Sequence, residues 1–181
     1  MSLNIVNATY KGKGCSRSDP INVVFKNIDV SEIEQFLTDP KQGWSKIGRL
    51  ENFLTRQFIS DPKKPAYRAK KLELCEKEQD IQFKLGKFYK RLHIRLWSMP
   101  NEITLDERVR NSIIAGVHID ILKFPGYHCP GDFEEAKKEF TKIIRDETRW
   151  NVKLDAVDLE WQFLGGHGQP WHNGKATQVV K

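Results

Sequence analysis

Residues 91–97, RLHIRLW, alternate between apolar side chains and side chains that can do chemistry. Successive side chains of a β-strand point to opposite faces, so Arg91, His93, Arg95 and Trp97 would share one face of a strand. Histidine titrates near neutral pH, and arginine presents planar donors to phosphate or carboxylate oxygens. This stretch therefore indicates a site for an anionic ligand in which histidine can transfer protons.

A second stretch, AGVHIDI, alternates in the same way and places His118 and Asp120 on one face. Two histidines can serve as general base and general acid, and Asp120 can orient one of them or activate water. If the two strands were neighbours in one sheet, these groups would suit hydrolysis of a phosphoester. The predicted catalytic residues are His93, His118 and Asp120. The sequence does not show whether the two strands are adjacent.

A simpler interpretation of the same pattern stays open. An antiparallel sheet with one solvated face alternates without having any function. Trp97 fits core packing as well as ligand stacking, and burial habits favour the core. The predicted ligand-binding residues, taken from the two strands, their ends and the glycine-rich loop, are Arg91, Arg95, Trp97, His128, Glu160, His167 and His172.

Metal binding and phosphate loops find little support in the residue spacings. His118, Asp120 and His128 could form a ligand set, but no H-x-x-x-H or H-E-x-x-H pair occurs. No cofactor and no metal ligand are therefore predicted, and a divalent metal ion is not favoured.

The loop GGHGQPWHNG (165–174) lets a ligand approach the backbone but lacks the G-K-S/T of a P-loop. A ligand lid and an ordinary connection both remain open for it.

Length and composition indicate one globular domain. The chain has 181 residues, 39% of them hydrophobic and 30% charged, and a net charge of +6. This charge is dispersed, which agrees with an anionic small molecule and does not favour nucleic acid as the partner. The sequence has no stretch long enough to span a membrane, no apolar leader segment, and three widely spaced cysteines. We therefore expect a soluble cytoplasmic protein; homo-oligomerisation stays open.

The predicted elements give a single α+β domain. Residues 1–20 are predicted to be a flexible N-terminal segment, and residues 21–181 a single domain. A helix is expected to begin at Ser31, with Glu34 completing a capping box, and the strongest helix pattern begins at Asp132. Another helix is expected within 48–60, and strands at 21–26, 71–77, 80–86, 91–97, 113–121, 157–165 and 175–181. Together these predict a largely antiparallel sheet flanked by helices, with a polar pocket on one sheet face under the 165–174 loop.

The order of motifs resembles the LssY C-terminal domain family. The motifs are GW at 43–44, LELCEKEQDIQF before RLHIRLW, VHID, HCPGDFEEAKKEF and GQPWHNGKATQVV, which together extend from about residue 21 to 180. The R-x-H-x-R-x-W strand of the family corresponds to Arg91, His93, Arg95 and Trp97. Its acidic position at the start of the long helix corresponds to Asp132, and its glycine after the terminal loop to Gly174. The resemblance supports the domain boundaries and the importance of the histidine strand; it names no reaction.

These observations lead to one principal hypothesis and alternatives from other classes. The principal one is recognition and hydrolysis of a small phosphate-bearing molecule, such as a linear or cyclic nucleotide. Arg91 and Arg95 would hold phosphate, His93 and His118 would exchange protons, and Asp120 would orient them. A non-catalytic binding protein for such a ligand is the alternative, because the sequence contains no complete catalytic constellation. A module that binds nucleic acid or protein also stays open.

Overall fold

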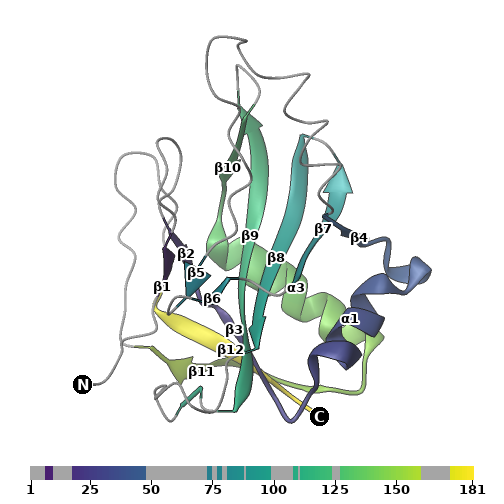
Figure 1. Cartoon of the computed structure of the whole chain (residues 1–181), viewed down its shortest axis with the longest axis vertical. Coiled ribbons are helices and arrows are strands. Elements are labelled where there is room, and N and C mark those ends of the chain that lie inside the picture. The colour runs from purple at the N-terminus through teal and green to yellow at the C-terminus, as the bar shows by residue number, and fades with distance from the viewer. Residues whose placement is uncertain are drawn as a thin grey trace.

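The computed structural model describes a sheet with helices packed against it (Figure 1). The residues that it describes are 7–9, 18–47, 73–74, 77–78, 81–87, 89–98, 108–109, 111–123, 127–159 and 172–181. None of the helices in this part of the chain is long and apolar enough to cross a membrane. The α+β class predicted from the sequence is confirmed.

The larger sheet contains eight described strands. Seven follow the order β11-β12-β3-β9-β8-β7-β4, and β10 pairs with the C-terminal end of β9. The parallel pairing of β12 with β3 is the exception among otherwise antiparallel pairs. The strands are β3 (Val23–Lys26), β4 (Ser45–Lys46), β7 (Ile81–Lys87), β8 (Lys90–Ser98), β9 (Ser112–Lys123), β10 (Tyr127–Pro130), β11 (Asn151–Asp158) and β12 (Lys175–Val180).

A second, smaller sheet is formed by four short strands in the order β2-β1-β5-β6. They are β1 (Asn7–Thr9), β2 (Ser18–Pro20), β5 (Glu73–Leu74) and β6 (Lys77–Glu78). Strand β2 also contacts β9 of the larger sheet. Two of these strands lie within residues 1–20, and the flexibility of that segment stays a prediction.

Local signals explain the helix boundaries. Helix α3 (Phe133–Glu147) begins after Asp132, whose carboxylate accepts a hydrogen bond from the Glu135 backbone N–H at 2.8 Å, as the sequence predicted. Helix α1 (Val30–Thr38) begins after Asp29 rather than at Ser31, so that cap prediction was wrong. Both positions carry a capping residue with a glutamate three residues later, and the Asp29 N–H donates to Glu32 Oε1 at 3.3 Å.

A short 3₁₀ helix, η1 (Pro40–Gln42), follows α1 and ends at Gly43, which has a φ of 67°. The predicted helix within 48–60 lies outside the described residues. The strand predicted at 157–165 begins earlier, as β11, and its residues from 160 onward also lie outside the description.

Both helices cover the same face of the larger sheet. This face carries the alternate apolar residues of β8 and β9, including Leu92, Ile94, Val117 and Ile119, all of them buried. Helix α3 packs Ala136, Phe140 and Ile144 against them, and α1 adds Ile33 and Leu37 to the same core. The helices thus bury one face of the sheet, and the polar residues of the same two strands are directed to the other face.

Candidate functional site

The two strands that carry the candidate residues are neighbours. Strands β8 and β9 pair antiparallel, with His93 opposite His118, Arg91 opposite Asp120, and Arg95 opposite Gly116. Residues directly opposite in an antiparallel pair lie on the same face. The condition on which the sequence-based site depended is therefore met, and the pairing brings the three predicted catalytic side chains into contact.

This face is buried rather than solvated. His93 is 3% exposed, His118 1% and Asp120 5%. Trp97 is also fully buried on this face, in agreement with the core-packing interpretation. The solvated-face interpretation of the alternation is therefore wrong for this part of the sheet, because a wet face would leave these side chains open to water.

Asp120 is the centre of the cluster. Its Oδ2 accepts a hydrogen bond from Arg91 Nε at 3.0 Å, and Arg91 Nη2 lies 3.0 Å from the same oxygen. Its Oδ1 lies 2.9 Å from His118 Nε2. Burial alone would raise the pKa of Asp120, but the charge and hydrogen bond of His118, followed by the proximity of His93, hold it well below its usual range. Asp120 is therefore a carboxylate at neutral pH.

The ionised carboxylate fixes the proton position on His118. A carboxylate only accepts hydrogen bonds, so His118 Nε2 must carry the hydrogen and donate it. Arg95 Nη1 lies 3.5 Å from His118 Nδ1, and because a guanidinium only donates, this contact is a hydrogen bond only when Nδ1 has a lone pair. Both ring nitrogens of His118 are therefore engaged by neighbours, which leaves this ring less suited to exchange protons with a ligand.

His93 has a different environment. Its ring lies 4.8 Å from the His118 ring between centroids, at an interplanar angle of 62°. His93 Nδ1 lies 3.3 Å from Asp120 Oδ2 without the alignment of a hydrogen bond, and neither ring nitrogen has a hydrogen-bond partner among the described residues. Burial, and then the charge of Arg95, lower the pKa of His93 to about 3, so the ring is neutral at pH 7. His93 is thus a buried polar side chain with unused hydrogen-bonding capacity.

The arginines at the two ends of the cluster are more exposed than its centre. The side chain of Arg91 is 15% exposed, that of Asp120 8% and that of His118 1%, and Arg95 is partly exposed like Arg91. Lys84, partly buried on β7 opposite His93, adds another cation to this face, and burial followed by the charge of Arg91 lowers its pKa.

For three of the other predicted ligand residues the structure does not test the prediction. His128 lies in β10 opposite Leu122, and its side chain is outside the description. Glu160 and His167 lie outside the described residues. The polar pocket predicted on this face also stays a prediction; a surface hollow of about 380 Å³ lies elsewhere, on the helix side, between η1, Leu85 and α3.

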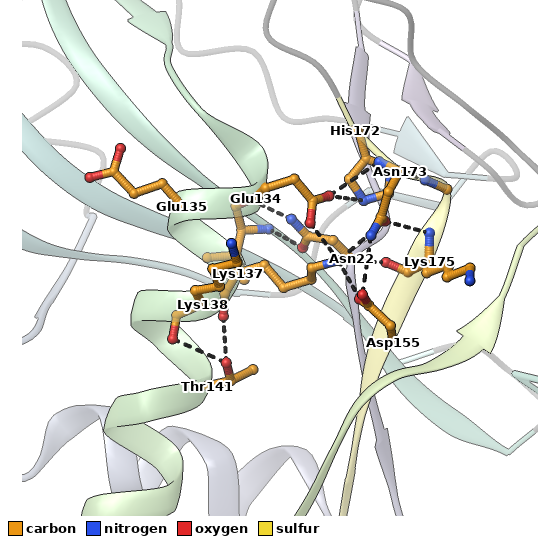
Figure 2. Close-up of polar contacts among 12 residues, drawn as sticks. Asn22, Glu134, Glu135, Lys137, Lys138, Thr141, Asp155, His172, Asn173 and Lys175 are labelled. Carbon is orange, nitrogen blue, oxygen red and sulfur yellow. Dashed lines mark hydrogen bonds and ion pairs between the residues drawn. The ribbon is translucent and has the colours of Figure 1, made fainter.

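His172 belongs to a second polar cluster, built around a buried lysine of α3 (Figure 2). Lys137 Nζ contacts Glu134 Oε2 at 2.9 Å and Asp155 Oδ1 at 2.6 Å. His172 Nδ1 accepts a hydrogen bond from the Gly174 N–H at 3.0 Å. Burial, followed by the charge of Lys137, lowers the pKa of His172 to about 4.

The sequence analysis missed this cluster, although a signal was present. Lys137 falls on the helix face that also carries Phe133, Phe140 and Ile144, where a lysine is unusual unless it is paired. Phe133 links the two clusters: its ring lies 6.3 Å from that of His118 and 6.4 Å from that of His172.

Comparison with known proteins bears on the strands that build the site. A sequence model described as LssY C-terminus matches residues 4–122, which include all of β8 and nearly all of β9. The chain belongs to this family. The match ends before α3 and the terminal loop, whose motifs also contributed to the resemblance. Searches of curated proteins and of solved structures gave no match.

The family positions carried over from the resemblance have different places in the structure. Of these positions, Arg91 and His93 lie at the cluster, and Arg95 lies beside His118. Asp132 caps α3, which is a structural role. Gly174 has a φ of 76°, a left-handed conformation that favours glycine.

Proposed function

We propose that the protein recognises and hydrolyses a small phosphate-bearing molecule, such as a nucleotide, at the Arg91–His93–Arg95–His118–Asp120 cluster. The observation that carries the proposal is His93, a buried imidazole next to two arginines, whose nitrogens have no hydrogen-bond partner in the part of the chain that the structure describes. A phosphate oxygen would give this ring a partner and would offset the positive charge. Arg91 and Arg95 are the cations that such an anion would contact.

Each residue has a role that follows from its contacts. Arg95 and the exposed side of Arg91 bind phosphate oxygens and stabilise charge that develops in the transition state. Asp120 attracts His93 Nδ1 and so favours the tautomer in which Nε2 has the lone pair. His93 Nε2 is then the proton acceptor for water. A bound anion raises the pKa of His93 from its low value, which makes the ring a better base.

A second candidate function is binding of the same ligand without conversion. The specific observation in its favour is the low pKa of His93, about 3, because a base that weak accepts a proton inefficiently at neutral pH. In such a protein the arginines would bind the ligand, and His93 would contribute a hydrogen bond.

One experiment separates these functions. The purified protein is incubated with a mixed pool of linear and cyclic nucleotides and other phosphometabolites, and the pool is analysed by chromatography and mass spectrometry before and after heat denaturation. A compound converted to a new product supports hydrolysis. A compound that leaves the free pool and returns intact supports binding alone. If no compound changes, both candidate functions are wrong.

Matched variants connect the result to the site. Arg95→Gln and His93→Asn remove the charge and the ring from the cluster, and we expect either change to reduce conversion or binding at least about tenfold, the scale of one lost charge-assisted hydrogen bond. Arg145→Gln is the control, because Arg145 is an exposed arginine in the last turn of α3. Equal activity of the cluster variants and the control would place the function elsewhere on the protein.

A further inference from the structure

The same strands place together three side chains that metal ions prefer. Within the part of the chain that the structure describes, His93, His118 and Asp120 each offer one ligand atom, and these atoms lie within 4.8 Å of one another. We infer that these three residues bind one divalent transition-metal ion, with Zn²⁺ as the best match to two imidazoles and a carboxylate.

Two donor-to-donor distances are close to those around a common ion, and the three ligand atoms together lie within 4.8 Å of one another. Donor atoms bound to one ion at about 2.0–2.2 Å lie roughly 3–3.5 Å apart in tetrahedral or octahedral geometry. Asp120 Oδ1 lies 2.9 Å from His118 Nε2, and Asp120 Oδ2 lies 3.3 Å from His93 Nδ1. Three protein ligands also leave a coordination position for water or substrate, as in catalytic zinc sites.

His93 gives independent support for an ion. This side chain is 3% exposed, and both of its ring nitrogens lack a hydrogen-bond partner among the residues that the structure describes. Buried polar groups are almost always satisfied, so a histidine in this state indicates a partner other than these residues. The 3.3 Å approach of its Nδ1 to Asp120 without hydrogen-bond alignment is the arrangement expected for two ligands that face the same ion.

The surrounding residues define how the ion and a ligand would act together. Arg91 holds Asp120 from the side, as outer partners of metal-bound carboxylates do. The guanidinium groups of Arg91 and Arg95 lie beside the proposed ligands, so an anion bound to the ion would also be close to them. When His118 binds the ion through Nε2, its Nδ1 must carry hydrogen, and Arg95 must turn away from its 3.5 Å contact.

The inference deepens the proposed function. It rests on that function where it assigns a ligand: the ion and Arg95, once Arg95 has turned away from His118, would both bind the phosphate-bearing molecule. The ion would lower the pKa of its bound water and polarise a phosphoryl oxygen, and His93 would then act as a ligand rather than as the base. Sequence spacing did not reveal the set because one ligand comes from β8 and two from β9.

The test is metal binding by the full chain. Protein stripped with a chelator is titrated with Zn²⁺ by calorimetry and with Co²⁺ by visible absorption. We expect one equivalent to bind, with a Co²⁺ spectrum of nitrogen and oxygen ligands. Absence of stoichiometric binding would overturn the inference. A thiolate-to-metal charge-transfer band would also overturn it, because the ion would then be held by cysteine; this readout requires no variant.

Variants then locate the ion. His93→Asn and His118→Gln should each weaken binding at least about 100-fold, since even outer-shell changes cost 10–100-fold. His172→Asn is the control, as a buried histidine outside the three ligands, and should bind like the wild type. Near-ultraviolet circular dichroism verifies the fold of each variant. If folded ligand variants bind as tightly as the control, the ion is adventitious and the inference is wrong.

The two proposals fail separately. If stripped protein still converts or binds a phosphate compound and no ion binds, the metal inference is wrong and the proposed function remains. If one ion binds at these residues and neither stripped nor reloaded protein changes any compound in the pool, the proposed function is wrong and the metal site remains.

Discussion

Removal of the buried charge at Lys137 should destabilise the protein more than any other change to a single lysine of α3. The ammonium group contacts Glu134 Oε2 at 2.9 Å, Asp155 Oδ1 at 2.6 Å, Asn173 Oδ1 at 3.2 Å and the Lys175 carbonyl oxygen at 3.0 Å. These contacts attach α3 to β11, to Asn173 before β12 and to the first residue of β12 (Figure 2). Lys137→Met keeps the length of the side chain and removes its charge.

The size of the effect follows from burial. Loss of one partner from a buried ion pair costs about 3–5 kcal/mol, because the other charge stays buried and unpaired. The side chain of Glu134 is 14% exposed but that of Asp155 is 43% exposed, so water screens one of the two carboxylates. We therefore expect the lower end, about 3 kcal/mol of the free energy of unfolding. For a chain of this size that corresponds to about 6–12 °C in Tm.

The assay is urea unfolding followed by circular dichroism, with Lys138→Met as the matched control. Lys138 is the next residue of the same helix, and it is exposed. Its replacement should change stability by no more than about 0.5 kcal/mol. Glu134→Gln combined with Lys137→Met should recover part of the loss, because the second change removes the stranded carboxylate. If the free energies of unfolding of Lys137→Met and Lys138→Met differ by less than about 1 kcal/mol, the contacts of the Lys137 ammonium group contribute little to stability and the argument is wrong.

Three further predictions concern single positions. The pKa of His172 is lowered to about 4 in the folded protein, so the free energy of unfolding should fall by at most roughly 3 kcal/mol as the pH decreases from about 6.5 to 4. His172→Asn should lose this pH dependence, which denaturant titrations at several pH values measure. Gly174→Ala should cost about 1–2 kcal/mol in the same assay, because φ is 76° there; no loss would mean that the backbone relaxes. The Asn22 side chain accepts a hydrogen bond from the Val117 N–H at 2.8 Å and donates one to the Val117 carbonyl oxygen at 2.7 Å. Asn22→Leu should therefore lower the free energy of unfolding by about 2–4 kcal/mol and speed hydrogen exchange of the Val117 amide. Unchanged exchange would contradict this.

The sequence by itself determined which residues share a face and where the main helix begins. Alternation in 91–97 and 113–121 depends on local strand geometry, and Asp132 forms its cap within one turn of α3. Local signals failed where two neighbouring positions offered the same chemistry. Asp29 and Ser31 can both cap a helix and are both followed by a glutamate three residues later, and the start at Asp29 could not be distinguished by spacing alone.

Only the tertiary structure decided that the alternating faces form one buried cluster. Strand pairing and register depend on contacts between distant segments, and a shift of one residue would have separated His93 from His118. Burial then determined the chemistry: it makes His93 neutral and sets it apart from a surface histidine. Lys137 shows the same limit, because its type is visible in the sequence but its acceptors come from β11 and from the segment leading into β12. The sequence pattern thus predicts which face of a strand or helix carries a side chain, and tertiary packing determines which residues that side chain contacts.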